Sequence, residues 1–142
     1  MSTATEAYDP LYLQGIAYFN ACEFFEAHEV WEELWKSYSG DLRLFYKGLI
    51  QAAVALHHFG NGNIRGARKV YRSSRAYLDA YRPVCEGLNL EQFLPQFDAC
   101  FALVAVSEEE FPDIEVDPEL IPEIALDPPV ELPPVVIGDH RD

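Results

Sequence analysis

A histidine and two glutamates lie within one turn of a predicted helix, in the run His-Glu-Val-Trp-Glu at residues 28–32. Each helical residue advances by about 100°, so His28 and Glu32 share one side of the helix and Glu29 lies at its margin. The run is close to the His-Glu-x-x-His helix of zinc peptidases, where two histidines bind zinc and the glutamate is the base. Here Glu32 replaces the second histidine, and carboxylate oxygen also binds zinc. The run can therefore supply two metal ligands, with Glu29 as general base.

A third ligand for such a metal would have to come from another helix. His57 and His58 stand near the end of an apolar segment and point about 100° apart, so they cannot both face one site. We take His58 as the candidate, which gives the ligand set His28, Glu32 and His58. Mixed imidazole and carboxylate ligands admit zinc, iron or manganese. No local spacing fixes this third ligand.

A second interpretation of the same residues needs no metal. The segment 42–59 is apolar almost all round, and its polar exceptions fall at intervals of four, four and seven: Arg43, Lys47, Gln51 and His58. This spacing aligns them along one side of a helix. The carboxylates of residues 28–32 can pair with Arg43 or Lys47, and His28 with Gln51, in a buried polar seam that also includes Trp35. Such a seam can be purely structural, or it can bind a small ligand or a protein partner.

Hydrophobic periodicity predicts five helices ahead of residue 107. Their expected ranges are 10–19, 21–38, 42–59, 64–81 and 89–105. Asn20, with Glu23 three residues later, matches a capping box, so we expect Asn20 to cap the second helix. A helix that is apolar nearly all round belongs at the centre of a bundle. The expected fold is an all-α, compact single-domain bundle of about five helices over residues 1–107, followed by an extended tail.

The net charge of −14 is concentrated in that tail, residues 108–142. Residues 1–107 carry 12 acidic and 9 basic side chains, whereas the tail carries 12 acidic side chains and one arginine. Seven of the ten prolines also lie beyond residue 107, which excludes a helix or a central strand there. We therefore expect an extended, acidic and proline-rich tail, although its several apolar residues are unusual for a purely solvating segment.

Four arginines form one face of the predicted helix 64–81: Arg65, Arg68, Arg72 and Arg75. A basic face of this kind can bind nucleic acid, but it lacks interleaved aromatic residues and the whole chain is acidic. Nucleic acid is therefore disfavoured as a partner. The face is either solvated or the docking site of the acidic tail, from the same chain or from a second subunit of a homo-oligomer.

Neither a signal peptide nor a membrane anchor is evident. The first residues contain no basic group and no apolar run, and no uninterrupted apolar stretch reaches membrane-spanning length. The three cysteines are far apart and do not form a Cys-x-x-Cys motif. They indicate thiols of a reducing compartment, so we expect a cytoplasmic protein without membrane contact.

Three ordered motifs resemble a known family. They are residues 24–32 with Trp35, residues 47–58, and Gly62-Asn63 followed by Gly66-Ala67. Together they resemble the domain of unknown function 309 family, over roughly residues 10–82. The resemblance implies a compact helical fold, and members of the family often carry the label "predicted metal-dependent hydrolase". Two functions therefore stay open, a non-enzymatic helical binding module and a metal-dependent hydrolase.

Overall fold

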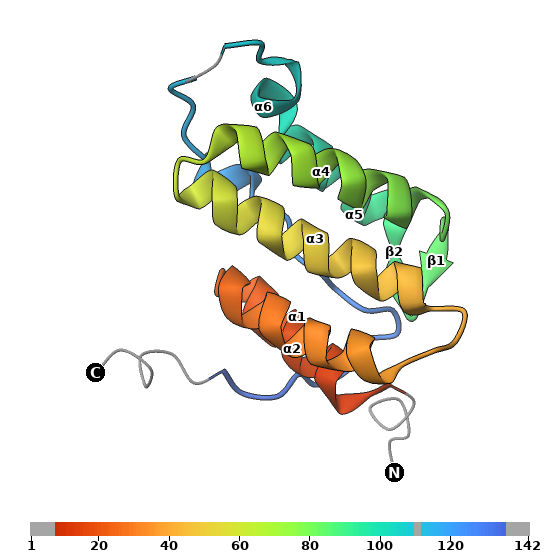
Figure 1. The fold of residues 1–142 in the computed structure, drawn as a ribbon. Coiled ribbons are helices and arrows are strands. Elements are labelled where there is room, and N and C mark those ends of the chain that lie inside the picture. Colours follow the sequence, from red (N-terminus) through yellow and green to blue (C-terminus); the bar gives the residue numbers. More distant parts are fainter. Residues whose placement is uncertain (1–7, 110–111, 136–142) are drawn as a thin grey trace.

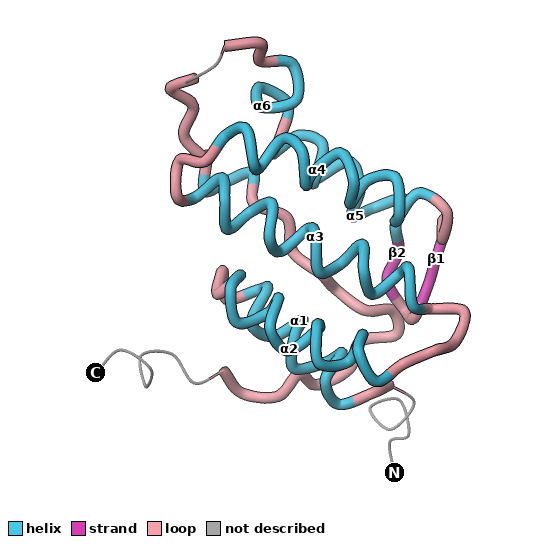
Figure 2. Tube along the Cα trace, viewed as in Figure 1, coloured by secondary structure: helices cyan, strands magenta, loops and turns pink. Residues whose placement is uncertain are grey.

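A computed structural model describes residues 8–109 and 112–135. Helices dominate this part of the chain: α1 Pro10–Asn20, α2 Phe24–Ser37, α3 Arg43–Gly60, α4 Ile64–Asp79, α5 Leu90–Cys100 and α6 Ala102–Val106. A small antiparallel hairpin joins α4 to α5, formed by β1 Val84–Cys85 and β2 Leu88–Asn89, and one turn of 3-10 helix, η2 Pro118–Leu120, follows later (Figure 2). The predicted fold class, a compact all-α bundle with an extended C-terminal segment, is confirmed. None of the helices in the described ranges has the length and apolar character needed to cross a bilayer.

Helix α3 is the central element of the bundle. It lies between the antiparallel pair α1–α2 on one side and α4 on the other, and α5 packs behind α4 (Figure 1). Its small residues Gly48, Ala52 and Ala55 are all buried, which allows the neighbouring helices to approach closely. On the α4 side, the Ser74 hydroxyl donates a 2.7 Å hydrogen bond to the carbonyl oxygen of Gly48. The predicted central position of this helix is therefore correct.

The contact between α1 and α2 depends on one tryptophan and one glycine. Trp31 of α2 is completely buried, and its indole Nε1 donates a 3.2 Å hydrogen bond to the carbonyl oxygen of Tyr12 in α1. Gly15 of α1 lies against the same indole, so close that a Cβ placed on it would stand 2.0 Å from Trp31 Nε1. A side chain at position 15 would therefore occupy space that the indole ring already fills.

Asn20 does not cap α2, so that part of the prediction is wrong. Asn20 is the last residue of α1, while α2 starts at Phe24 and its N-cap, Glu23, makes no side-chain capping bond. The side-chain amide of Asn20 instead makes two hydrogen bonds to a segment that is distant in sequence. Its Nδ2 donates to the carbonyl oxygen of Ile124 at 2.9 Å, and its Oδ1 accepts from the Ile124 amide at 2.8 Å. The side chain thus satisfies both backbone groups of one residue in the C-terminal segment.

That segment, residues 112–135, crosses the bundle as an extended strap. It leaves the α3–α4 turn, passes to the β1–β2 hairpin and returns along α1 (Figure 1). At the hairpin, Leu126 bridges Leu88, and the Asp127 amide donates a 2.9 Å hydrogen bond to the Gly87 carbonyl. Ile124 and Leu126 are buried while Ala125 is exposed, as the two-residue period of an extended chain requires. The strap is therefore part of the hydrophobic core.

Candidate functional site

Helix α2 buries a different face from the one that carries the candidate ligands. Its core residues are Ala27, Trp31 and Leu34, whereas His28 and Glu32 each lie one residue, or about 100°, further round. The side chains of His28 and Glu32 are 23% and 40% exposed. The prediction that these residues form a buried polar seam is therefore wrong. The face of α2 that enters the core carries Ala27, Trp31 and Leu34, so His28 and Glu32 lie at the edge of the α2–α3 contact.

Helices α2 and α3 run antiparallel, and two contacts fix their register. The rings of Phe25 and His57 lie 5.5 Å apart between centroids, and the Lys47 Nζ lies 4.5 Å from the centre of the Trp35 ring. From Phe25 to Trp35 the chain advances ten residues along α2, and from His57 to Lys47 the facing positions go back ten residues along α3. By this register Gln51 stands opposite the 28–32 run, so the sequence correctly predicts which parts of the two helices face each other.

The two cations of α3 contact an aromatic ring instead of a carboxylate. The Arg43 Cζ lies 3.9 Å and the Lys47 Nζ 4.5 Å from the centre of the Trp35 ring, which is the geometry of cation–π contacts. Within residues 8–109 and 112–135, no carboxylate oxygen comes within 4.0 Å of either cation. The expected pairing of the α2 glutamates with Arg43 or Lys47 is therefore not formed.

The polar contact of the 28–32 run lies within α2 itself. His28 Nε2 is 3.7 Å from Glu32 Oε2, one helical turn away, and Glu29 is exposed. The expected hydrogen bond between His28 and Gln51 is also not formed. Instead, the Oε1 atom of Gln51 is buried, and no partner for it lies in the described part of the chain.

A second buried polar atom lacks a partner on the same pair of helices. The indole Nε1 of Trp35 is inaccessible and makes no hydrogen bond to any described residue. An unpaired buried donor or acceptor costs about 1–3 kcal/mol, so native proteins leave few of them. Trp35 thus presents an unused donor, and Gln51 an unused acceptor, beside the two cations. We call Trp35, Arg43, Lys47 and Gln51 the α2–α3 site.

The three predicted metal ligands are not brought together. The Nδ1 atom of His58 lies 3.3 Å from the side-chain nitrogen Nδ2 of Asn63, the N-cap residue of α4. It is His57 whose ring contacts α2. Burial, and the neighbouring His57, lower the pKa of His58 from its usual value. Over the described ranges, no three His, Cys, Asp or Glu side chains group closely enough to hold a metal ion. His28 and Glu32 therefore remain a pair without a third ligand.

The arginines of α4 make contacts that the sequence does not reveal. Arg75 binds both carboxylate oxygens of Asp98 in α5, at 2.7 and 3.1 Å. Arg68 Nε and Arg72 Nη2 donate to the carbonyl oxygens of Val104 and Ala105, at 3.0 and 2.9 Å. These bonds fasten α5 and α6 to α4. Docking of the acidic tail on this face stays a prediction.

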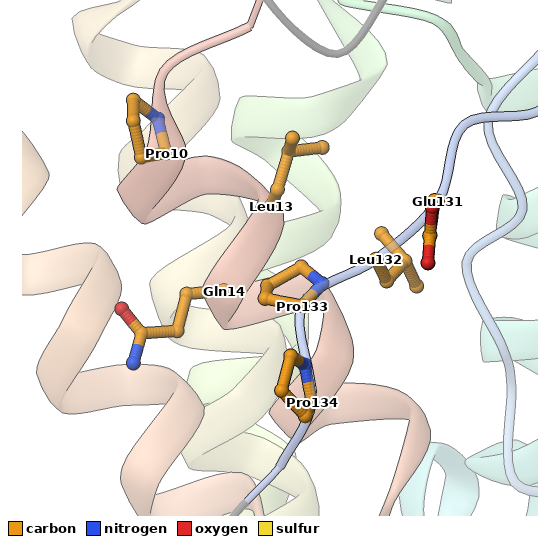
Figure 3. A pocket seen from close by; sticks show the side chains of 7 residues that line it. All are labelled: Pro10, Leu13, Gln14, Glu131, Leu132, Pro133 and Pro134. Carbon is orange, nitrogen blue, oxygen red and sulfur yellow. The ribbon is translucent and has the colours of Figure 1, made fainter.

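A groove with a volume of about 560 Å³ lies between α1 and the strap (Figure 3). It is lined by Pro10, Leu13, Gln14, Glu131, Leu132, Pro133 and Pro134. Among its described lining residues, Glu131 is the one ionisable group, and none is a histidine, a cysteine or a cation. The groove thus offers apolar contact but no acid–base pair or nucleophile, so the α2–α3 site is the better candidate for function.

The α2–α3 site lies within a part of the chain that matches a known protein family. Residues 12–70 match the model of a family described as "Domain of unknown function (DUF309)". The chain carries a DUF309 domain. This domain begins within α1, includes all of α2 and α3, and ends within α4, so it contains every residue of the α2–α3 site. The strap lies outside it, although it contributes to the same core.

Two bacterial proteins are similar to this chain over about half of its length. The chain is 35% identical over 86 residues to the "Uncharacterized protein YpuF" of Bacillus subtilis, covering 59% of this chain and 49% of that protein. It is 37% identical over 73 residues to an "Uncharacterized protein" of Aquifex aeolicus, covering 51% of this chain and 22% of that protein. The matched region thus spans about half or less of these curated relatives, and neither name states an activity.

Proposed function

We propose that the DUF309 domain is a non-enzymatic binding module whose α2–α3 site holds an anionic group of its ligand, a carboxylate or a phosphate. The observation that carries the proposal is a set of three donors that have no anionic partner among the residues of the described ranges. They are the Arg43 guanidinium, the Lys47 ammonium and the buried indole N–H of Trp35. Charge-assisted hydrogen bonds to carboxylate or phosphate are the strongest that such donors form.

The start of α3 adds to the positive potential of the site. Arg43 is the first residue of α3, Lys47 lies one turn later, and the N-cap residue Leu42 provides no side-chain acceptor. The first N–H groups of a helix and its dipole favour an anion at this end. An anion that draws the two cations off the ring of Trp35 would also uncover the indole N–H as a third donor.

Gln51 supports a ligand that carries more than an anion. Its unpaired Oε1 lies one helical turn beyond Lys47, which is about 5.4 Å along the axis. An acceptor at this distance suits an N–H or O–H group next to the anionic group. We therefore expect a ligand with both, such as an amino acid, a peptide terminus or a hydroxylated phosphate.

Calorimetric titration with two simple probes, glycerol 3-phosphate and N-acetylglycine, tests this proposal. We expect saturable binding with a dissociation constant on the order of 1 mM. The double variant Arg43→Gln/Lys47→Gln should bind at least about tenfold more weakly, because it removes two charge-assisted contacts of about 1.5–3 kcal/mol each.

Lys36→Gln provides the matched control, since it also removes a cation near the end of α2 but from an exposed position outside the site. It should bind both probes as the unchanged protein does. Equal weakening in Lys36→Gln would show only a general charge effect. Absence of saturable binding of either probe to the unchanged protein would contradict the proposal.

One observation favours the alternative, a metal-dependent hydrolase. His28 and Glu32 lie 3.7 Å apart on one face of α2, as two ligands of one metal would. The residues that the structure describes do not fit a complete site, because no third ligand joins them. No hydrolytic step can therefore be derived for Glu29.

Elemental analysis separates the two functions. We expect the purified protein to contain less than stoichiometric zinc, iron or manganese, and the His28→Ala variant to have the same metal content. Stoichiometric metal that is lost in His28→Ala would support the hydrolase. Turnover of an ester, amide or phosphate that disappears in Glu29→Gln would establish it.

A further inference from the structure

A second polar surface, away from the α2–α3 site, is formed by α4. Arg65, Arg68, Lys69 and Arg72 line a hollow of about 540 Å³ together with Gly66. We call these four cations the basic face. No described carboxylate lies within 4.0 Å of any of them, whereas Arg75, further along α4, is paired with Asp98. The basic face is thus a cluster of positive charge on a chain whose net charge is −14.

An exposed apolar patch borders the basic face. Leu103 and Val106 of α6 are 68% and 73% exposed, the highest values among the large apolar side chains described. The Arg68 and Arg72 guanidinium groups bind carbonyl oxygens of α6, which fixes this helix against α4. Leu103 and Val106 therefore stand beside the cations, and exposed apolar residues at a charged rim are typical of an interface.

Carboxylates follow the apolar patch directly. Glu108 and Glu109 are exposed and come two and three residues after Val106. On the strap, Glu115 is also exposed, and its segment lines a hollow beside the α3–α4 turn, close to the start of the basic face. Positive, apolar and negative groups thus follow one another from α4 through α6 to the residues just after it.

We infer that this surface binds a second copy of the chain through a two-fold interface. In such an interface the same patch serves on both subunits, so it must be complementary to itself. A two-fold axis through Leu103 and Val106 would bury the apolar patches against each other. The same axis would bring the basic face of one subunit toward the carboxylates after α6 of the other.

The neighbouring carboxylates favour this partner over a polyanion. A membrane of anionic lipids or a nucleic acid strand would approach the basic face with a broad array of phosphates. Glu108, Glu109 and Glu115 would meet the same array and repel it. A second copy instead supplies both signs of charge and an apolar centre, which matches what this surface presents.

Analytical ultracentrifugation of the full chain tests the inference. We expect a concentration-dependent monomer–dimer equilibrium that shifts toward monomer as salt is raised, because exposed charge pairs are screened. Leu103→Asp should weaken the dimer by tenfold or more. Its melting temperature should equal that of the native chain at concentrations at which both are monomeric, since the side chain is exposed in the monomer. Val84→Asp is the control, because Val84 is 54% exposed but lies on β1, away from the patch.

Charge reversal distinguishes ionic complementarity from apolar contact alone. Lys69→Glu and Glu108→Lys should each weaken the dimer, whereas an equimolar mixture of the two variants should form heterodimers. A mixture that stays monomeric, or a native chain that is monomeric at all concentrations and salts, would overturn the inference. Retention of a monomeric chain on phosphatidylserine vesicles or on RNA would overturn it as well and would assign the surface to that polyanion.

Discussion

Replacing Gly15 by alanine is expected to lower the free energy of unfolding by about 3 kcal/mol, at the upper end of the usual cost of overpacking a core. The added Cβ would stand 2.0 Å from Nε1 and 2.4 Å from Cδ1 of Trp31, a side chain that is completely buried. The indole cannot withdraw without losing its hydrogen bond to the Tyr12 carbonyl. Urea denaturation followed by circular dichroism measures the effect.

Gly60→Ala is the matched control for this substitution. Gly60 is the last residue of α3, and a Cβ placed on it meets no side chain of the described part of the chain within 4 Å. Alanine is the better helix former by about 1 kcal/mol, so this variant should be unchanged or slightly more stable. A Gly15→Ala protein as stable as Gly60→Ala would show that α1 and α2 do not pack this closely.

Ile124→Asp is expected to have an effect of similar size, about 3 kcal/mol or more, because it places an unpaired carboxylate in an apolar site. Ile124 is 2% exposed, and both of its backbone groups are bound by the Asn20 amide. Hydration of the new carboxylate requires this part of the strap to leave the bundle. Denaturation measures the lost stability, and hydrogen exchange of the residue 124 amide reports the release of the strap.

Ala125→Asp introduces the same side chain one residue later, at an exposed position of the extended strap. It should change the stability little and leave the amide of Ile124 protected. If Ile124→Asp behaved in the same way as Ala125→Asp, the strap would not belong to the core. The experiment thus separates a structural strap from the solvated tail that the acidic composition alone would favour.

The helices were predictable because their signals are local. Apolar spacing and the Gly-Asn-Gly-Asn run after α3 place the boundaries of α3 and α4 within two residues. The role of Asn20 was not predictable, because the same Asn-x-x-Glu pattern suits a helix cap and its real partner, Ile124, lies 104 residues away. The strap was predicted to be extended, and its several apolar residues were noted as unusual for a purely solvating segment, but its packing against the bundle was not predicted.

Trp35, Arg43, Lys47 and Gln51 were singled out from the sequence, but the contacts expected between the cations and the α2 glutamates are not formed. Sequence spacing aligns Arg43, Lys47 and Gln51 correctly along α3. It does not determine which face of α2 points toward α3. Because α2 buries the face that carries Trp31, its carboxylates lie too far from these cations to pair with them. Trp35, one turn after Trp31, takes the place opposite them. The predicted ion pairs between the α2 glutamates and the α3 cations were therefore wrong, although residues 28–32 do lie opposite Gln51 as expected.

The most direct measurement for the proposed anion site is the nitrogen-15 spectrum of the two indole N–H groups during titration with glycerol 3-phosphate. Trp35 Nε1 has no partner among the described residues, whereas Trp31 Nε1 is bound to the Tyr12 carbonyl and serves as an internal reference. We predict that the Trp35 signal shifts saturably while the Trp31 signal stays in place, and that Arg43→Gln/Lys47→Gln abolishes the shift. An unmoved Trp35 signal, or equal movement of both signals, would contradict an anion site at α2 and α3.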